Sequence, residues 1–352
     1  MNLLVFAGLY DHKLESKISP ILALEKVETM FLLRNMPLPL AKVQSFTPPS
    51  LLNLLFVREI YKFFRAVHLC LTQRIDYVCG IYFRPHGLLA SWIGRLFSLP
   101  VILVFIGNDV DICLRRKRLW WRMLRRSYRI GVRGSRSEDR LNSIVGDKGK
   151  FFRHHNVFSL DFSPIQEDHS SKDIDLICIA DFSRVKRMDL FLEICSHLKQ
   201  YNPTFKAVML GGGRRRPYER KRDRLGLHDT VEFAGKVGDV YSYLQRSRVF
   251  ILTSDAEGLP MTMIEAMAAG VPCVVPDVGD ITDIAENGKT AMVVPPGRTD
   301  VFAEAVQLLL ENRELAGRLI EGAQLVLEQK REEFSLAHNI KIWDQILVKT
   351  DG

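Results

Sequence analysis

The chain has 352 residues, which at about 150 residues per domain predicts two domains. It is 47% hydrophobic and 26% charged, a globular composition that excludes fibrous, collagen-like and wholly disordered proteins. The net charge of +8 is uneven, because residues 1–165 contain 25 basic and 12 acidic residues whereas residues 166–352 contain 24 and 29. The basic first half favours a partner that carries phosphate, either a nucleic acid, an anionic lipid or a phosphorylated substrate.

Short aliphatic runs alternate with helical patterns along the chain. The runs predict strands at residues 3–8, 101–107, 175–180, 206–212, 231–235, 249–254 and 272–276. Apolar residues at helical spacing predict helices at 188–198, 261–269 and 301–310, the last with Asp300 as its N-cap. Buried strands separated by helices are typical of a parallel sheet that is covered on both faces. The predicted fold class is therefore α/β.

Targeting signals and cysteine usage indicate where the protein works. The N-terminal run MNLLVFAGLY lacks the basic region and cleavage site of a secretory signal, so we expect it to be a strand. Residues 86–107 are long and apolar, but Arg95 and Pro100 interrupt them and favour a helix followed by a strand over a membrane span. The six cysteines show no CxxC spacing and indicate buried thiols in a reducing compartment. We expect a cytoplasmic protein, with peripheral attachment to the inner face of the membrane as the alternative.

A polar, aperiodic stretch separates two halves. Residues 163–173, SPIQEDHSSKD, contain Pro and no hydrophobic repeat. We therefore predict one domain over residues 1–165 and a second over residues 170–333.

The most informative stretch is SDAEGLPMTMIEAMAAGVPCVVP at residues 254–276. A strand ends at Ser254 and a helix begins near Pro260, so the amides of Met261 and Thr262 face outward from a helix N-terminus, which favours phosphate. Pro260 itself has no N–H to donate. Glu265, about one turn further, is placed to accept hydrogen bonds from two vicinal hydroxyls, as on a ribose. The alternative is that Glu265 only complements the helix dipole.

The same stretch resembles the retaining glycosyltransferases of family four, in the GT-B superfamily. Glu257 and Glu265 within EGLPMTMIE match the signature of that family. The order of the flanking motifs also agrees: DLICIADFSRVKRMDLFLEI, VMLGGG, LGLHDTVEFAGKV, YLQRSRVFILTSDAEG, then VPCVVPDVGDITDIAENGKTAMVVPPGR. The resemblance covers residues 158–301 and is much weaker before them.

The resemblance implies an architecture and a set of roles. Two Rossmann-like domains would face each other across a cleft, the first binding the acceptor and the second the donor, with a last helix at about 334–352 crossing back to the first. Glu265 would hold the donor ribose, Glu257 a hydroxyl of the donor sugar, and Lys186 the diphosphate, whose charge grows as it leaves. The backbone at four positions would approach the base and ribose: Gly211, Gly212, Lys236 and Val237. No metal and no cofactor are implied beyond the nucleoside diphosphate sugar.

Two positions depart from the family pattern. Asp181 stands where relatives have an arginine, and Arg184 is the expected substitute for that cation. Ile106 stands where many relatives have a histidine.

The first half offers candidate residues on the acceptor side. Asp109 follows a strand and is expected to orient an acceptor hydroxyl or accept its proton. A structural capping role is one alternative for Asp109, and a metal-binding DxD motif completed by Asp111 is another. The acceptor side is further expected to include Gly8, Asn108 and His86, although a purely structural histidine is equally compatible with His86.

Residues 113–140 carry eleven basic residues between Arg115 and Arg140, interleaved with Trp120, Trp121 and Tyr128. This pattern predicts an interface helix on anionic lipid. One alternative is a solvated helix that buries its aromatic residues inward. Another is nucleic-acid binding, for which no recognisable module accompanies the segment.

The hypothesis from sequence is a retaining transferase. It would move a hexose-type sugar from a nucleoside diphosphate to a hydroxyl of a glycan or lipid-linked acceptor, in surface polysaccharide or glycolipid assembly. Two alternatives are a nucleotide-sugar 2-epimerase on the same fold and a non-catalytic protein that binds nucleotide sugars or acts as a scaffold.

Overall fold

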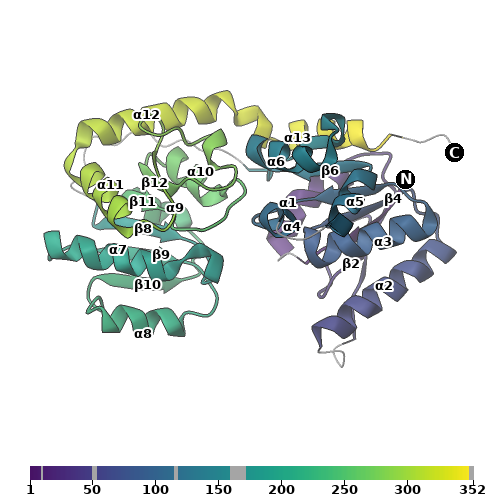
Figure 1. Cartoon of the computed structure of the whole chain (residues 1–352), viewed down its shortest axis with the longest axis horizontal. Helices are drawn as coiled ribbons and strands as arrows, with labels where there is room; N and C mark the ends of the chain where they lie inside the picture. Colours follow the sequence, from purple (N-terminus) through teal and green to yellow (C-terminus); the bar gives the residue numbers. More distant parts are fainter. Residues whose placement is uncertain (9–10, 50–53, 115–117, 159–171, 349–352) are drawn as a thin grey trace. The chain divides into compact units, whose positions relative to one another are not determined.

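The computed structural model describes residues 1–8, 11–49, 54–114, 118–158 and 172–348. Its contacts divide the chain into a first unit, Met1–Ser159 with Glu332–Gly352, and a second unit, Leu160–Arg331 (Figure 1). Each unit contains one parallel sheet with helices between successive strands, which confirms the predicted α/β class with two Rossmann-like domains. Among the described helices, none is both long and apolar enough to cross a membrane.

The first unit is built on a seven-stranded sheet of order β3-β2-β1-β4-β5-β6-β7. Its strands are β1 Asn2–Phe6, β2 Thr29–Leu33, β3 Val43–Phe46, β4 Tyr77–Ile81, β5 Val101–Val104, β6 Arg129–Val132 and β7 Phe151–Arg153. Its helices are α1 Asp11–Leu22, α2 Leu55–Thr72, α3 Leu88–Phe97, α4 Asp109–Leu114, α5 Arg118–Arg126, α6 Ser135–Val145 and α13 Leu336–Ile346.

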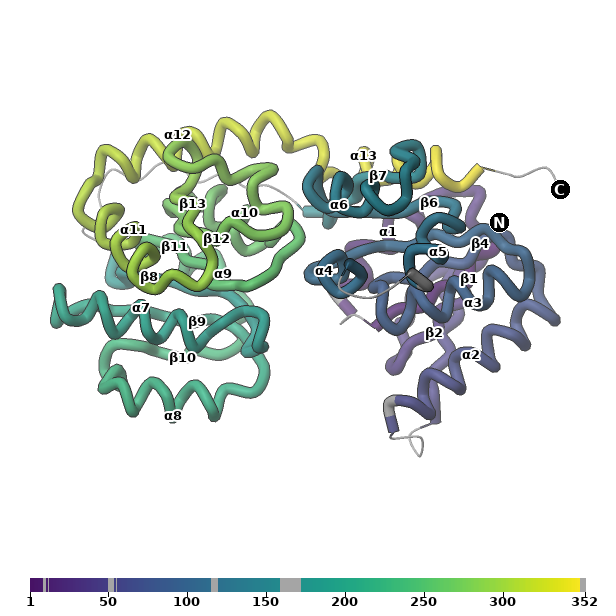
Figure 2. The backbone as a smooth tube through the Cα atoms, viewed as in Figure 1, coloured from purple at the N-terminus to yellow at the C-terminus, as the bar shows by residue number. Residues whose placement is uncertain are grey.

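Both faces of this first sheet are buried. Along β1, Leu3 and Val5 pack in one core cluster with α1 and α13, whereas Leu4 and Phe6 pack in a second cluster with α2, α3 and α5. This alternation explains why β1 reads as a continuous apolar run. The last helix, drawn in yellow, lies against α1 although more than 300 residues separate them (Figure 2).

The second unit is built on a six-stranded sheet of order β10-β9-β8-β11-β12-β13. Its strands are β8 Ile174–Ile179, β9 Ala207–Leu210, β10 Val231–Gly235, β11 Ser247–Ile251, β12 Cys273–Pro276 and β13 Met292–Val294. Its helices are α7 Met188–Tyr201, α8 Arg216–Arg224, α9 Val240–Gln245, α10 Met261–Ala268, α11 Thr299–Glu311 and α12 Arg313–Gln329.

The structure confirms every strand and helix predicted from periodicity, with shifts of a few residues at their ends. Residues 86–107 contain α3 and β5, as expected for a helix followed by a strand. The prediction that Asp300 caps α11 is wrong, because α11 begins at Thr299 and Asp300 lies inside the first turn, paired with Arg298. The boundary predicted at residues 163–173 lies almost wholly outside the described residues.

The basic segment 113–140 is not one interface helix. It contains α5, then strand β6, then the start of α6. Trp120 lies edge-on to the buried Phe83 ring at 5.1 Å, so this aromatic residue points into the unit. The alternative reading, in which the aromatics turn inward, describes this segment better.

Candidate functional site

Five loops of the second unit lie at one edge of its sheet. They follow β8, β9, β10, β11 and β12, and because all these strands are parallel, their carboxyl ends meet at the same edge. Ligands of open α/β sheets bind at this edge. Every donor-side residue predicted from the sequence lies on one of these loops or at the start of the helix that follows β11.

The structure brings Lys186 and Glu257 into direct contact. The Lys186 Nζ lies 2.5 Å from Glu257 Oε1, and the Ser254 hydroxyl donates to the same oxygen at 2.6 Å. The Glu257 side chain is 7% exposed and that of Lys186 is 24% exposed, so the lysine is the more accessible member of the pair. Sequence analysis assigned both charged residues to the site but gave Ser254 no role, although it lies only three residues before Glu257.

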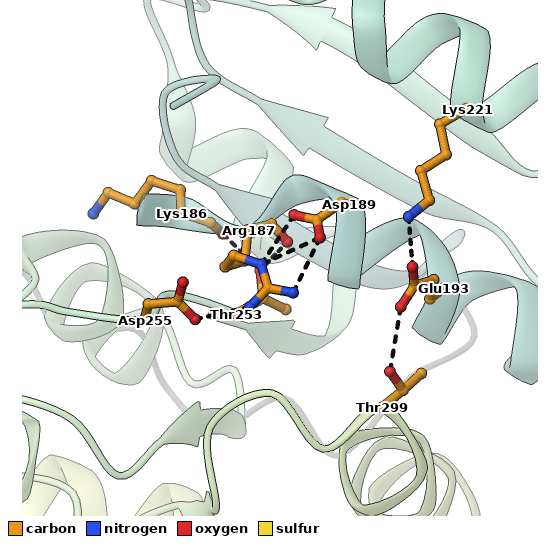
Figure 3. A network of polar contacts seen from close by, with 8 residues as sticks. All are labelled: Lys186, Arg187, Asp189, Glu193, Lys221, Thr253, Asp255 and Thr299. Atoms are coloured by element: carbon orange, nitrogen blue, oxygen red, sulfur yellow. Dashed lines mark hydrogen bonds and ion pairs between the residues drawn. The ribbon is translucent and has the colours of Figure 1, made fainter. Parts of the chain in front are cut away.

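A backbone network holds the loop after β8 against the loop after β11. The Thr253 hydroxyl donates to the carbonyl oxygen of Lys186 at 2.9 Å, and the Asp255 amide donates to the carbonyl oxygen of Val185 at 2.8 Å. Arg187, in the left-handed region with φ +51°, binds the carboxylates of both Asp189 and Asp255 (Figure 3). In Figure 3 the Lys186 amine points away from this cluster. The network therefore fixes the backbone of Lys186 without neutralising its amine.

The loop after β9 packs closely against the backbone that follows β8. A Cβ on Gly211, at φ +151°, would lie 1.9 Å from the Ala180 carbonyl oxygen, so only glycine fits. A Cβ on Gly212 would lie 2.4 Å from Cε of Lys236, so the side chain of Lys236 packs directly against Gly212. Asp181 Oδ1 accepts a hydrogen bond from the Gly212 amide at 3.2 Å. The Asp181 carboxylate therefore holds the glycine turn.

Helix α10 begins where the sequence predicts. Pro260 is its extended N-cap and provides no side-chain cap, so the first amides of the helix, starting at Met261 and Thr262, have no such partner. Glu265 is partly exposed in the second turn, and burial raises its pKa. A helix start that lacks a capping side chain is suited to an anionic ligand.

Gly279, in the loop after β12, is a supporting residue that the sequence analysis did not identify. Its φ is +55°, and a Cβ there would lie 1.8 Å from the carbonyl oxygen of Glu257. Next to it, the Asp280 amide donates to the Gly258 carbonyl at 3.3 Å. The glycine lets this loop press directly on the loop that carries Glu257.

Arg184 and Val237 lie on two of the donor-side loops, after β8 and β10. Arg184 opens the short 3₁₀ turn Arg184–Lys186 and its side chain is exposed, with no hydrogen bond or ion pair to the described residues. Val237 follows β10 and is partly exposed. Their roles toward the diphosphate and the base stay predictions.

Asp109 in the first unit is 2% exposed and bound to the backbone. Its Oδ2 accepts hydrogen bonds from the amides of Phe83 and Ile106, both at 3.0 Å. Burial raises the pKa of Asp109 to about 7, and these two hydrogen bonds oppose the rise. The geometry fits a structural role that joins two loops at the carboxyl ends of β4 and β5, and contact with an acceptor hydroxyl stays a prediction.

The two carboxylates of the DxD reading do not act together. Asp111 pairs with Arg140 at 2.7 Å, whereas Asp109 binds backbone amides. Within the described residues, no group of three or more His, Cys, Asp or Glu side chains is placed to hold a metal ion.

His86 and Gly8, which the sequence analysis assigned to the acceptor side, lie in contact; their role toward an acceptor stays a prediction. A Cβ on Gly8 would lie 2.5 Å from Cε1 of the His86 ring. The ring is buried, and its Nδ1 has no hydrogen-bond partner among the described residues. Burial, helped by the nearby charge of Lys62, lowers the pKa of His86 to about 3, so the ring is neutral at physiological pH. Asn108, just before α4, is partly exposed.

A buried cluster of basic side chains near the carboxyl ends of β6 and β7 was not predicted from the sequence. Lys17, Arg133 and His154 are each less than 9% exposed. Lys17 donates to Asn156 at 2.5 Å, and burial together with the charge of Arg133 lowers the pKa of this lysine. The sequence gives no signal for this group, because Lys17 lies 116 residues before Arg133 along the chain.

A cavity of about 420 Å³ in the first unit contains none of the predicted site residues. It lies between β7 and α13 and is lined by residues that include Phe152, His155, Glu333 and Ile342.

The second unit is similar in sequence to a known family of glycosyltransferases. Residues 161–326 match the family described as glycosyl transferases group 1. The match covers less than half of the chain, and it spans the strands and helices that carry the donor-side residues.

Individual relatives agree with this class. The alpha-D-kanosaminyltransferase of Streptomyces kanamyceticus is 31% identical over 141 residues, which cover 39% of this chain and 36% of the relative. The N-acetyl-alpha-D-glucosaminyl L-malate synthase of Bacillus anthracis is 28% identical over 198 residues, which cover 54% and 51%. The Vi polysaccharide biosynthesis protein VipC/TviE of Salmonella typhi is 31% identical over 110 residues, which cover 31% and 19%. The chain thus matches about half or less of the length of these relatives.

The fold as a whole resembles solved structures. The crystal structure of Anabaena HepE in complex with UDP and glucose superposes with a TM-score of 0.75 at 16% identity, and covers 99% of both chains. At this identity the likeness establishes the fold, which is the GT-B class predicted from the sequence.

Proposed function

We propose that the protein is a retaining glycosyltransferase of family four that transfers a hexose-type sugar from a nucleoside diphosphate to a hydroxyl group. The observation that carries the proposal is the Lys186–Glu257 pair, held at the carboxyl edge of the second sheet beside the uncapped start of α10. The match to glycosyl transferases group 1 over residues 161–326 supports it.

In the proposed reaction, Lys186 would stabilise the diphosphate as its negative charge grows, which is stabilisation of the transition state. The amides at the start of α10 would bind the same diphosphate, and Glu265 the ribose hydroxyls. Glu257 would accept a hydrogen bond from the sugar while it keeps Lys186 oriented. We further propose a glycan or lipid-linked acceptor in polysaccharide assembly, which is supported by the match to the Vi polysaccharide biosynthesis protein.

The donor assignment is tested by calorimetry with a panel of nucleoside diphosphates, UDP among them. We expect the Glu265→Ala variant to bind the preferred nucleotide on the order of tenfold or more weakly, since it loses a charged hydrogen-bond acceptor. Glu304→Ala on the exposed face of α11 is the matched control and should bind like the unchanged protein. Equal affinity in both variants would contradict the ribose assignment.

The reaction itself is tested with radiolabelled nucleotide sugars and a membrane extract as the source of acceptor. Label transferred with retained anomeric configuration supports the proposal. Epimerised donor, or nucleotide binding without turnover, would instead identify an epimerase or a binding protein.

A further inference from the structure

The first unit exposes large apolar side chains along two neighbouring helices. Of the fourteen large apolar side chains that are exposed in the described part of the chain, seven lie on α2 or α3 or at the residue before α2. They include Phe56 at 76% exposure, Phe64 at 65% and Trp92 at 54%; the others are Leu54, Ile60, Leu71 and Leu96.

The spacing of these residues makes a stripe. Phe56, Ile60 and Phe64 follow one another at four-residue intervals and so share one face of α2. The opposite face of α2 already packs in the core through Ala66 and Leu69. A surface helix normally presents polar residues on the face turned away from the core, but α2 presents aromatic ones.

The stripe continues onto α3. The Phe63 ring of α2 contacts the Trp92 ring of α3 edge-on at 6.4 Å. Trp92 and Leu96 extend the exposed apolar surface along α3. Figure 2 shows α2 and α3 running beside each other, with α5 near α3.

A basic groove borders this apolar stripe. It lies between α3 and α5, has a volume of about 340 Å³, and is lined by residues that include Trp92, Arg95, Arg122, Met123 and Arg126. All three arginines are exposed, and none forms an ion pair or hydrogen bond with the described residues. The planar guanidinium group matches the geometry of phosphate oxygens.

We propose that α2, α3 and α5 form a docking surface for a membrane that contains anionic lipids. The stripe of Phe56, Ile60, Phe64, Trp92 and Leu96 enters the boundary between headgroups and acyl chains. The groove arginines bind lipid phosphates, as basic pockets between helices do. The proposal moves the contact predicted at residues 113–140. It keeps the arginines of α5, but it replaces the inward-facing Trp120 with the aromatic residues of α2 and α3.

Charge favours a membrane over a second copy of this chain. A symmetric dimer through this face would set the three unpaired arginines of one copy against the same arginines of the other. An anionic leaflet offers both opposite charge and an apolar layer at the depth of the stripe. The surface belongs to the first unit alone and is independent of the donor-side residues.

The electrostatic part is tested by flotation of the full-length protein with vesicles. We expect binding to phosphatidylcholine vesicles that contain phosphatidylglycerol, weak binding without it, and release at high salt. The variant R95Q/R122Q/R126Q should bind about fivefold more weakly per arginine removed, or on the order of a hundredfold in total. The control R216Q/R220Q/R224Q removes three exposed arginines from α8 of the second unit and should bind like the unchanged protein.

The apolar part is tested with Phe56→Ser combined with Phe64→Ser. We expect weaker binding to anionic vesicles with an unchanged far-UV spectrum, because both side chains are exposed. Tyr201→Ser combined with Leu325→Ser removes two equally exposed apolar residues from the second unit and should have no effect. Brominated lipids should quench the tryptophan fluorescence, and the Trp92→Phe variant should lose most of that quenching.

Three outcomes would overturn the proposal. The first is vesicle binding that does not depend on anionic lipid. The second is a loss of vesicle binding in the α8 control variant as large as that in R95Q/R122Q/R126Q. The third is sedimentation that shows a dimer which the Phe56 and Phe64 substitutions dissociate, with no vesicle binding in either form. Donor affinity, measured separately by calorimetry, should stay unchanged in every variant of this surface.

Discussion

Lys186 and Glu257 form a pair whose two members are buried to different extents. Glu257 is 7% exposed and accepts hydrogen bonds from Lys186 and Ser254, whereas the side chain of Lys186 is 24% exposed. Removing one partner of a buried pair is costly when it leaves the other charge buried. The two truncations should therefore have unequal effects on stability.

We expect Lys186→Met to lower the free energy of unfolding by about 3 kcal/mol, because Glu257 loses its countercharge. Glu257→Gln should lower it by about 1 kcal/mol or less, because Lys186 remains hydrated. Urea unfolding of both variants and of the double variant measures the difference. Equal losses would show that the pair is not buried asymmetrically.

Asp109 gives a pH dependence with a definite sign. Its pKa in the folded protein is about 7, above its ordinary value, so between about pH 4 and pH 7 the folded state holds a proton that the unfolded state has lost. The contribution of Asp109 to stability is therefore fully present below about pH 4 and is lost as the pH rises through 7.

Asp109→Asn removes this titration and keeps an oxygen that accepts from the amides of Phe83 and Ile106. We expect the variant to gain stability relative to the unchanged protein between pH 5 and pH 8, by about 3 kcal/mol, because about two pH units lie between pH 5 and the folded pKa and each corresponds to about 1.4 kcal/mol. Urea unfolding at both pH values measures the gain. The titration of His86 is common to both proteins and cancels. A difference that does not vary with pH would contradict the assignment.

At the scale of elements, the donor loops depend on glycines that accept close backbone contact. Gly279 and Gly288 both have positive φ, +55° and +73°. A Cβ at Gly279 would lie 1.8 Å from the Glu257 carbonyl oxygen, whereas one at Gly288 would meet nothing within 4 Å. An alanine at either position would be strained by the positive φ, but only at Gly279 would its Cβ also clash with another residue.

We expect Gly288→Ala to lower the free energy of unfolding by about 1 kcal/mol and to leave sugar transfer unchanged. Gly279→Ala should displace the loop that carries Glu257 and slow transfer by on the order of a hundredfold. Steady-state rates with a saturating donor compare the two variants. Similar rates would show that the loop after β12 does not position Glu257.

Sequence patterns predicted helices and strands better than they predicted which residues contact one another. Hydrophobic periodicity and turn residues were sufficient to predict the strands and helices of the second unit, because each such element depends on residues that are neighbours in sequence. Three contacts join residues that are not sequence neighbours: Asp181 with the Gly212 amide, Lys17 with Arg133, and Gly279 with Glu257. No local pattern encodes such contacts, so they required the structure.

At the scale of the molecule, the first unit is discontinuous. Helix α13 joins it from the far end of the chain, and Trp343 and Ile346 are buried in the core that β1 and α1 build. Tyr77 of β4 donates its hydroxyl hydrogen to the Val348 carbonyl oxygen at 2.6 Å. The last helix is therefore part of the first core.

We expect Trp343→Ala to lower the free energy of unfolding of the first unit by about 3 to 5 kcal/mol. Leu336→Ala, at an exposed position of the same helix, should change it by less than about 0.5 kcal/mol. Thermal unfolding measures both, and nucleotide binding should persist in both at low temperature. Loss of nucleotide binding in the folded Trp343→Ala variant would show that the donor site depends on the first unit.

This discontinuity sets an order of events on the ribosome. The strands that open the sequence emerge first, yet the helix that seals their hydrophobic face is synthesised only after all of residues 160–331. The intervening unit is continuous and has every residue it needs to fold as soon as it leaves the exit tunnel. The first unit is thus completed only after the second, and until then the apolar face that α13 covers stays open to solvent.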